Sequence, residues 1–262
     1  MRKKILIVAK TYPTRSQKYK ELVCTAGVDE EGNWYRIYPI PTKNLKEYEG
    51  LKKYTWIDAE ITKDSSDNRP ESHKINISSV KLLDFIDRKP NWQYRKDILF
   101  KSKIYKDLTE IIRLANDDNS LSLCLFKPNK FLRINFETKD IKEPNEKEKK
   151  DFVNANLNLF EDESCSVEFN EMPQIPYNIK MVFEDINGKE SKMNILDWEI
   201  SQLYLNLKNR GDGDKEIKQK IKDKLWGFMN NRDLYLCLGT MKMMHGWTSN
   251  PFRKLTRTIL PK

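Results

Sequence analysis

The chain has 262 residues and a formal net charge of +9, with 33% charged and 11% aromatic side chains. This aromatic content excludes a disordered chain, because disordered segments hold few aromatic residues. The sequence contains no run of about 18 apolar residues, so it predicts no segment that crosses a membrane. The apolar run that ends at Ala9 is too short for a secretion signal and predicts a buried first strand.

The cysteines and histidines do not show the spacing of a metal site. None of the four cysteines forms a CxxC pair, and a zinc site requires closely spaced ligand pairs. We therefore expect no metal and no cofactor, and we place the protein in a reducing cytoplasm. The residues concerned are Cys24, Cys124, Cys165, Cys237, His73 and His245.

The positive charge is unevenly distributed along the chain. Residues 1–139 hold 28 Lys and Arg against 19 Asp and Glu, a net +9. Residues 140–189 hold 6 against 12, a net −6, and residues 190–262 hold 14 against 8, a net +6. Two basic lobes with an acidic connector are typical of a nucleic-acid-binding protein, although a lysine-rich proteome explains the same charge equally well.

The elements predict an α+β fold with two lobes. The first lobe (residues 1–139) has short strands rich in β-branched and aromatic residues, which favour a small OB-like β-barrel with a helical insertion over 99–115. A hairpin of residues 121–126 and 131–136 is expected to close this lobe. The predicted barrel strands are residues 4–10, 22–28, 34–40, 54–62 and 80–85.

An acidic linker over residues 140–175 precedes the second lobe, residues 176–262. An Asn-Gly turn at 187–188 predicts a hairpin between strands 179–183 and 192–195. Two amphipathic helices follow, around 196–207 and 217–228, and strands 233–239 and 255–260 complete a ββααββ order.

The hairpin of residues 23–41 is the strongest candidate for function. Its second strand places Trp34, Arg36 and Tyr38 on one face, and Tyr35 and Ile37 on the other. Two aromatic rings beside a guanidinium form a combination that stacks on bases and pairs with phosphate. The alternative is that the rings pack in the core, with the arginine extended to solvent.

Two neighbouring loops add candidate contacts. The loop of residues 11–20 holds Tyr12, Arg15 and Lys18, and the loop of residues 68–74 holds Arg69 and Lys74. Polar groups gathered on a loop between strands carry function more often than strand interiors do. The alternative for the second loop is a local turn that an Arg69–Glu71 pair stabilises.

Two stretches resemble known bacterial proteins. The first, with Cys24, Ala26 and Gly27 followed by Trp34, Arg36 and Pro39, resembles dual-OB-type domains. The second stretch includes ILDWEISQLY, DLYLCLGT and ILPK and is similar to the C-terminal part of a group of uncharacterised bacterial proteins. The first resemblance implies a nucleic-acid-binding barrel in proteins of antiviral defence or mobile elements, and the helix pair departs from the dual-OB pattern.

We therefore predict a non-catalytic nucleic-acid-binding subunit of a bacterial defence or mobile-element assembly, acting on DNA or RNA. One alternative is a metal-dependent nuclease that uses Asp58, Glu60 and Glu71. A weaker nuclease pattern is Asp185, Glu190 and Lys192. Another alternative is a scaffold that docks a protein partner through the Trp-rich strands and the acidic linker. The surface around Met243, Trp247 and Phe252 is consistent with a protein partner for the nucleic-acid-binding protein as well. The lysines of the second helix at 215, 218, 220, 222 and 224 are more simply a solvated face.

Overall fold

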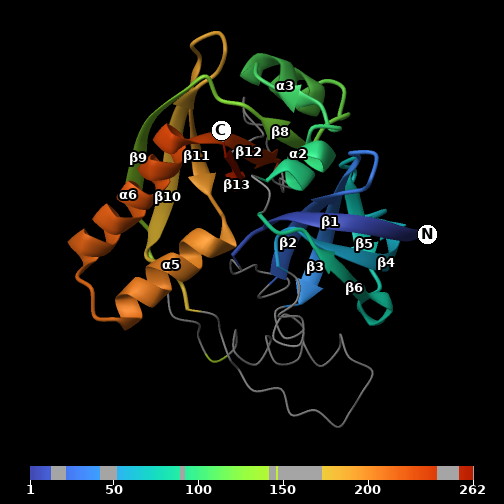
Figure 1. Ribbon diagram of the computed structural model, residues 1–262, viewed down its shortest axis with the longest axis horizontal. Helices are drawn as coiled ribbons and strands as arrows, with labels where there is room; N and C mark the ends of the chain where they lie inside the picture. The colour runs from blue at the N-terminus through green and yellow to red at the C-terminus, as the bar shows by residue number, and fades with distance from the viewer. Residues whose placement is uncertain are drawn as a thin grey trace.

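Figure 1 shows a computed structural model of the chain, in which a β-barrel lies beside a second sheet that carries two long helices. No helix in the described part of the chain is both long and apolar enough to cross a membrane. The structure describes residues 1–12, 22–41, 52–88, 92–141, 146, 173–240 and 254–261.

Five strands close the N-terminal barrel in the order β1-β2-β3-β5-β4, and β4 pairs back onto β1. The β3–β5 pairing is parallel and the others are antiparallel. The predicted α+β class with an OB-like barrel is confirmed. The strands are β1 (Arg2–Lys10), β2 (Leu22–Val28), β3 (Trp34–Pro41), β4 (Thr55–Lys63) and β5 (Ser72–Ile75), with β6 (Lys81–Phe85) paired to β4 outside the closed ring.

The barrel is filled by alternate residues of its strands. Ile5 and Ile7 of β1 point into it with Ile37 of β3, and all three are completely buried. Leu6 and Val8 point outward and are equally buried, because the second lobe covers this wall. The first strand is therefore a continuous apolar run, as its sequence predicts.

Local turn chemistry sets the β2–β3 hairpin. The Asp29 carboxylate accepts hydrogen bonds from the backbone N–H groups of Glu31 and Asn33 and from the Tyr35 hydroxyl. Gly32 adopts φ +87°, a conformation that glycine reaches without strain. Ser102 donates to the Gly32 carbonyl at 2.5 Å and anchors the turn to the following segment.

The single helix predicted over 99–115 is wrong. The chain forms α2 (Gln93–Leu99), the short strand β7 (Ile104–Tyr105) and α3 (Leu108–Asn116). Asp107 caps α3 by accepting from the Thr109 N–H at 2.7 Å, so a new helix begins there. A short 3-10 turn, η1 (Ile77–Ser79), precedes β6.

The second sheet has seven strands in the order β7-β8-β12-β13-β11-β10-β9. Its C-terminal part follows the predicted ββααββ order, including the β10–β11 hairpin around Gly188. The strands not yet given are β8 (Leu123–Phe126), β9 (Lys130–Thr138), β10 (Tyr177–Glu184), β11 (Glu190–Ile195), β12 (Arg232–Gly239) and β13 (Lys254–Pro261).

The predicted hairpin between the eighth and ninth strands is also wrong. β8 pairs with β7 and β12, whereas β9 pairs with β10 at the opposite edge of the second sheet. Neither strand closes the barrel. A division at residue 139 thus separates both strands from the sheet to which they belong, and most of residues 140–175 lie outside the described part.

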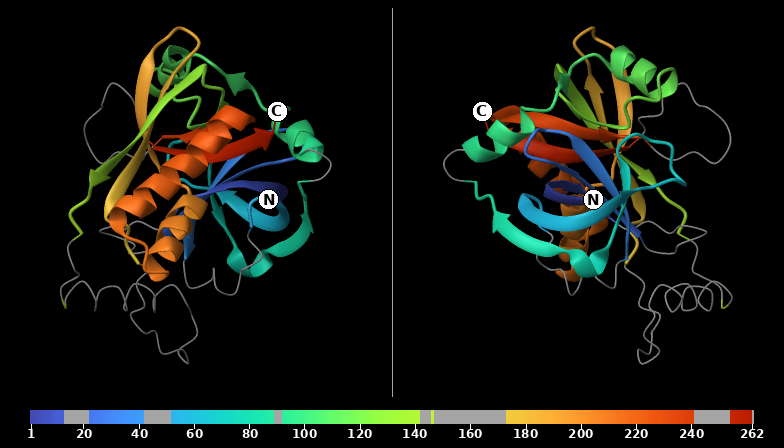
Figure 2. Two further views of the ribbon diagram at one scale, coloured as in Figure 1. Left: turned by 60° about the vertical axis from the view of Figure 1, so that its left-hand side comes forward. Right: turned by 90° about the vertical axis from the view of Figure 1, so that its right-hand side faces the viewer.

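The helices α5 (Trp198–Asn209) and α6 (Asp214–Asn231) lie along one side of the second sheet, as the left view of Figure 2 shows. Ile200, Tyr204 and Leu207 of α5 face the sheet, and Ile221 and Leu225 of α6 join the same core. These are positions that the periodicity of the sequence predicts.

The opposite side of the sheet meets the barrel. In β12, Leu236 faces the helices, while Tyr235 belongs to the cluster that contains Leu6 and Val8 of β1. In β8, Leu125 joins that cluster in the same way. The two lobes therefore share one apolar layer.

Gly27 allows close contact between β2 and β1. A Cβ atom at this position would lie 2.5 Å from the Leu6 carbonyl oxygen and 2.5 Å from Ile5 Cγ2. We expect Gly27→Ala to lower the free energy of unfolding by about 3 kcal/mol, because the strand backbones must separate. Urea unfolding followed by circular dichroism measures this change.

The matched control is Gly227→Ala in α6, where nothing lies within 4 Å of the added atom. This variant should gain about 0.5–1 kcal/mol, because alanine is the better helix former. Equal destabilisation by both variants would contradict the close-contact explanation.

Candidate functional site

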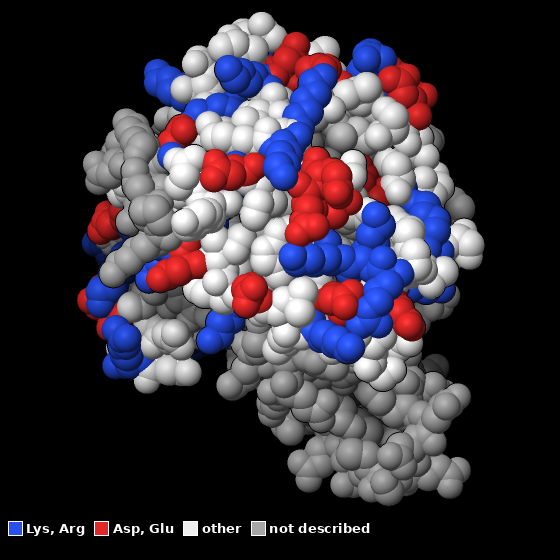
Figure 3. All heavy atoms as spheres, turned by 45° about the vertical axis from the view of Figure 1, so that its right-hand side comes forward, with Lys and Arg blue, Asp and Glu red and all other residues white. Residues whose placement is uncertain are grey.

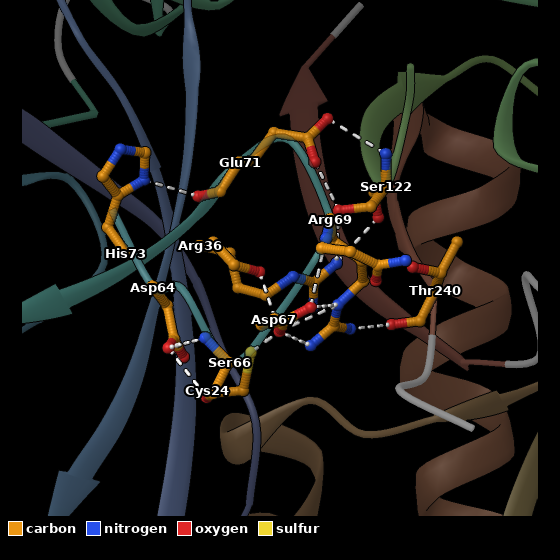
Figure 4. Close-up of polar contacts among 12 residues, drawn as sticks. Cys24, Arg36, Asp64, Ser66, Asp67, Arg69, Glu71, His73, Ser122 and Thr240 are labelled. Atoms are coloured by element: carbon orange, nitrogen blue, oxygen red, sulfur yellow. Dashed lines mark hydrogen bonds and ion pairs between the residues drawn. The ribbon is translucent and has the colours of Figure 1, made fainter. Parts of the chain in front are cut away.

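Motif residues from distant stretches meet where the barrel touches the second sheet (Figure 4). We call this group the interlobe cluster. It combines β2, β3 and the β4–β5 loop of the barrel with the chain before β8 and after β12 of the second sheet. Its members are Cys24, Arg36, Asp67, Arg69, Glu71, Ser122 and Thr240.

Arg36 links the two lobes from inside the interlobe cluster. It is 5% exposed, and its Nη2 donates to the Ser122 carbonyl at 2.7 Å and to Ser122 Oγ at 3.2 Å. Its Nη1 lies 3.6 Å from Cys24 Sγ. Burial lowers the pKa of Arg36, and the charge of Arg69 acts in the same direction. The guanidinium is therefore placed to hold the lobes together.

Glu71 makes the reciprocal link. Its carboxylate accepts from the Ser122 and Leu123 backbone N–H groups at 3.0 and 3.3 Å, and from the Ser122 hydroxyl. Its own carbonyl accepts from the Arg36 N–H at 2.7 Å. The carboxylate of Glu71 and the guanidinium of Arg36, both from the barrel, thus hold the start of β8 in place.

Arg69 pairs with Asp67 through two parallel contacts, at 3.0 Å from Nε and 2.6 Å from Nη2. Arg69 Nη1 also donates to the Thr240 carbonyl at 2.8 Å, at the end of β12. Burial alone would raise the pKa of Asp67, but the hydrogen bonds and charge of Arg69 outweigh it and hold that pKa well below its usual range. The expected local Arg69–Glu71 turn is replaced by this Arg69–Asp67 pair.

A second group, the lysine–tryptophan cluster, lies at the end of β1. Thr11 connects it to the interlobe cluster, because Thr11 pairs with Cys24 through its backbone and side chain and bridges to Asp197. The members of the lysine–tryptophan cluster are Lys10, Tyr12, Lys53, Asp197, Trp198 and Glu199.

Lysines and an indole ring are held together in the lysine–tryptophan cluster. Lys10 Nζ lies 5.1 Å from the centre of the Trp198 ring, and the Tyr12 ring packs on the same indole at 5.3 Å. The side chain of Lys53 is 8% exposed and forms an ion pair with Asp197 at 2.6 Å. Burial, with the Lys53 charge, lowers the pKa of Lys10 to about 8, although Glu199 acts in the opposite direction.

The start of α5 positions Trp198, and Lys53 lies next to a residue with a strained backbone. Asp197 caps α5 by accepting from the Glu199 N–H at 2.9 Å, so Trp198 is the first helical residue. Tyr54, next to Lys53, adopts φ +69° although it is not glycine. Such strained residues gather at functional sites.

The remaining predicted contacts are distributed as follows. Trp34 is partly buried and packs on the apolar clusters between the lobes. Tyr12 is buried, and its hydroxyl donates to the Pro173 carbonyl at 2.8 Å. Lys74 is exposed, 3.7 Å from Asp64. Arg15, Lys18 and the side chain of Tyr38 lie outside the described residues.

The side chains of β3 alternate between two faces as the sequence predicts. Tyr35 and Ile37 lie inside the barrel, and Trp34 and Arg36 lie on its outer face. The second lobe covers that face, which the sequence does not reveal. Sequence reasoning also missed Lys10, Lys53 and Trp198. One signal existed for Lys10, since it ends a buried strand directly before a basic loop.

The barrel surface does not gather charge of one sign on the side that Figure 3 shows, where basic and acidic side chains are interspersed. Several described basic groups on the barrel are paired: Arg2 Nε lies 2.9 Å from Asp58, and Lys4 Nζ lies 2.8 Å from Glu30. A broad positive surface is therefore absent from the described residues on that side.

The acids proposed for a nuclease do not form a metal site. Asp58 and Glu60 both contact Arg2, whereas Glu71 belongs to the interlobe cluster. Asp185 accepts three backbone N–H groups, among them that of Leu108 at 3.0 Å. Across the described ranges, no three His, Cys, Asp or Glu side chains are arranged to hold a metal ion.

The comparisons divide the chain between two family models. Residues 105–252 match the model described as Domain of unknown function (DUF8757), and residues 1–101 match Domain of unknown function (DUF8758). The first match ends just after α2, and the second begins within β7. A comparison with curated proteins found no match.

The Asp67–Arg69 pair generates a prediction about stability. Asp67→Asn should lower the free energy of unfolding at pH 7 by about 3 kcal/mol, because it leaves Arg69 partly buried without its anion. The folded-state pKa of Asp67 is depressed, so its stabilising contribution is present above the unfolded pKa and is lost as the pH falls below about 4. The difference between variant and parent should shrink there in pH-dependent urea unfolding.

Asp58→Asn is the control, since Asp58 forms its ion pair with Arg2 on the exposed surface. It should cost less than about 1 kcal/mol at any pH. An Asp67→Asn effect as small as this would show that the pair does not stabilise the lobe contact.

Proposed function

We propose that this chain, which belongs to the family described as Domain of unknown function (DUF8757), binds nucleic acid. The confirmed OB-like barrel supports the proposal, because barrels of this kind bind single strands with aromatic rings and cations. The observation that carries it is Lys10 over the Trp198 ring, with Lys53 held beside them. The lysine–tryptophan cluster places the two kinds of group that a single strand requires at one end of β1.

The sequence beside this cluster adds charge. Tyr12 is followed by residues 13–20, which include Arg15 and Lys18. In this proposal they contact phosphates, with Lys74 as a further contact, while Arg36 and Arg69 maintain the lobe geometry. A role in a defence or mobile-element assembly follows only from the family resemblance, which is an argument by analogy. The cytoplasmic location is proposed from the cysteine pattern, and the non-catalytic role from the absence of a recognisable catalytic motif in the sequence.

The first test is the salt dependence of binding. The protein should bind a fluorescent single-stranded oligonucleotide at 50 mM salt, and its affinity should fall steeply by 200 mM salt, because each phosphate contact releases counterions. Fluorescence anisotropy with DNA and RNA of the same sequence gives the affinity and the slope. Absence of binding at 50 mM salt, or a flat response to salt, would refute the proposal.

A second test concerns Lys10 itself. Lys10→Gln should weaken binding roughly 3- to 10-fold and reduce the salt slope by about one, as expected for a single lost phosphate contact. Lys103→Gln removes the same charge from an exposed pair with Glu110 and is the control. Equal losses in both variants would show that only net charge matters.

A further inference from the structure

Arg36 is a buried cation that forms no ion pair with any described residue. Its Nη2 binds the Ser122 carbonyl and hydroxyl, which are both neutral, and its Nε has no hydrogen-bond partner within the described ranges. The Glu71 carboxylate accepts hydrogen bonds from Ser122 and Leu123 rather than from this guanidinium. Because a charge is costly to bury without a counter-ion, the guanidinium is prepared for an anion beside it.

Cys24 places its sulfur against this guanidinium. The Cys24 Sγ lies 3.6 Å from Arg36 Nη1 (Figure 4). A thiol sulfur is only a weak hydrogen-bond acceptor, so the contact compensates little of the positive charge. Cys24 is a free cysteine and is partly exposed, whereas Cys124 and Cys237, the other cysteines that the structure describes, are buried. A partly exposed cysteine beside a cation is the kind that oxidants attack selectively.

We propose that Cys24 is a site of reversible oxidation, at which hydrogen peroxide converts the thiol to a sulfenic acid. The anion of this acid gives Arg36 the charged oxygen acceptor that the reduced protein lacks. Oxidation thus adds a contact inside the interlobe cluster, next to the link from Arg36 to Ser122. The inference goes beyond nucleic-acid binding and does not depend on it.

The chemical step is balanced with hydrogen peroxide as the oxidant. The Cys24 sulfur, as the thiolate, attacks one oxygen of the peroxide, so that an S–O bond forms and the O–O bond breaks. The departing hydroxide takes up the proton that the thiol released, and the products are sulfenic acid and water. The sulfur loses two electrons and the peroxide gains them. Arg36 stabilises the negative charge beside it during this step.

A small thiol such as glutathione reverses the oxidation. The thiolate of one glutathione attacks the Cys24 sulfur, and the sulfenic oxygen leaves as water, which gives a mixed disulfide. A second glutathione attacks this disulfide at the glutathione sulfur, releases the Cys24 thiol and forms oxidised glutathione. The two glutathione molecules supply the two electrons.

Labelling with dimedone, which reacts with sulfenic acids, tests the site. The full-length protein is treated with hydrogen peroxide and dimedone at pH 7, and peptide mass spectrometry measures the labelling of Cys24. The initial rate should be roughly threefold or more above that in urea-unfolded protein, where Arg36 no longer lies beside the sulfur. Burial alone gives the opposite order, because the fold restricts access. A rate in the folded protein that is equal or lower would overturn the inference.

Two substitutions separate the effect of the charge from a loosening of the lobes. Arg36→Gln removes the cation beside Cys24 and should lower its rate of labelling roughly threefold or more. Arg69→Gln is the control, because its guanidinium belongs to the same cluster but binds Thr240, and it should label at the parental rate or above. Equal losses in both variants would overturn the role of Arg36. If Arg36→Gln does not fold, the comparison of folded and unfolded parent decides.

A final measurement tests reversibility. Glutathione added after the peroxide and before dimedone should lower the labelling of Cys24 about tenfold, and excess glutathione should return the peptide to the mass of the free thiol. Oxygen that persists on Cys24 after this treatment would show irreversible damage and would overturn the proposed reversible site.

Discussion

The apolar layer between the barrel and the second sheet determines the architecture. Leu6 and Val8 of β1 leave the barrel on one side and meet Leu125 and Tyr235 on the other. Both lobes need this layer, because each has a strand that is apolar on both faces and must be covered twice. The interlobe cluster lies beside the layer, where Arg36 and Glu71 form hydrogen bonds with backbone groups at the buried start of β8. Packing brings the lobes together, and directional hydrogen bonds fix their register.

This arrangement gives different roles to motif residues that resemble each other in the sequence. Arg36 lies between aromatic residues of a strand and Arg69 lies in a polar loop, and both were predicted to contact nucleic acid. Their guanidinium groups instead bind Ser122, Asp67 and Thr240 within the protein. Lys10 gave no motif, and it lies over an indole that is partly exposed. The groups that position the lobes and the groups proposed to contact a ligand are thus separate, and Thr11 connects them.

The sequence predicted what depends on local pattern. The apolar run that ends at Ala9 predicted the buried first strand, Asn187 and Gly188 marked a hairpin, and helical periodicity identified Ile200 and Leu225. The sequence-based prediction failed where the structure depends on a partner that is distant in the sequence. β8 and β9 read as a hairpin because a short turn joins them, but each finds its partner elsewhere in the sheet. The cover over Arg36 and the approach of Trp198 to Lys10 depend on the same long-range packing, which no local pattern encodes.

The shared layer also has a consequence for biosynthesis. The strands that close the barrel are all complete once Ile75 has left the ribosome. The outward side chains of β1, however, are covered only after β12 has been synthesised, because they pack against Tyr235. Until Tyr235 has been synthesised, the apolar side chains of Leu6 and Val8 on the outside of the nascent barrel remain exposed to water and to other chains. A newly made N-terminal half is therefore a natural client for a chaperone, and expression of residues 1–101 alone should favour self-association.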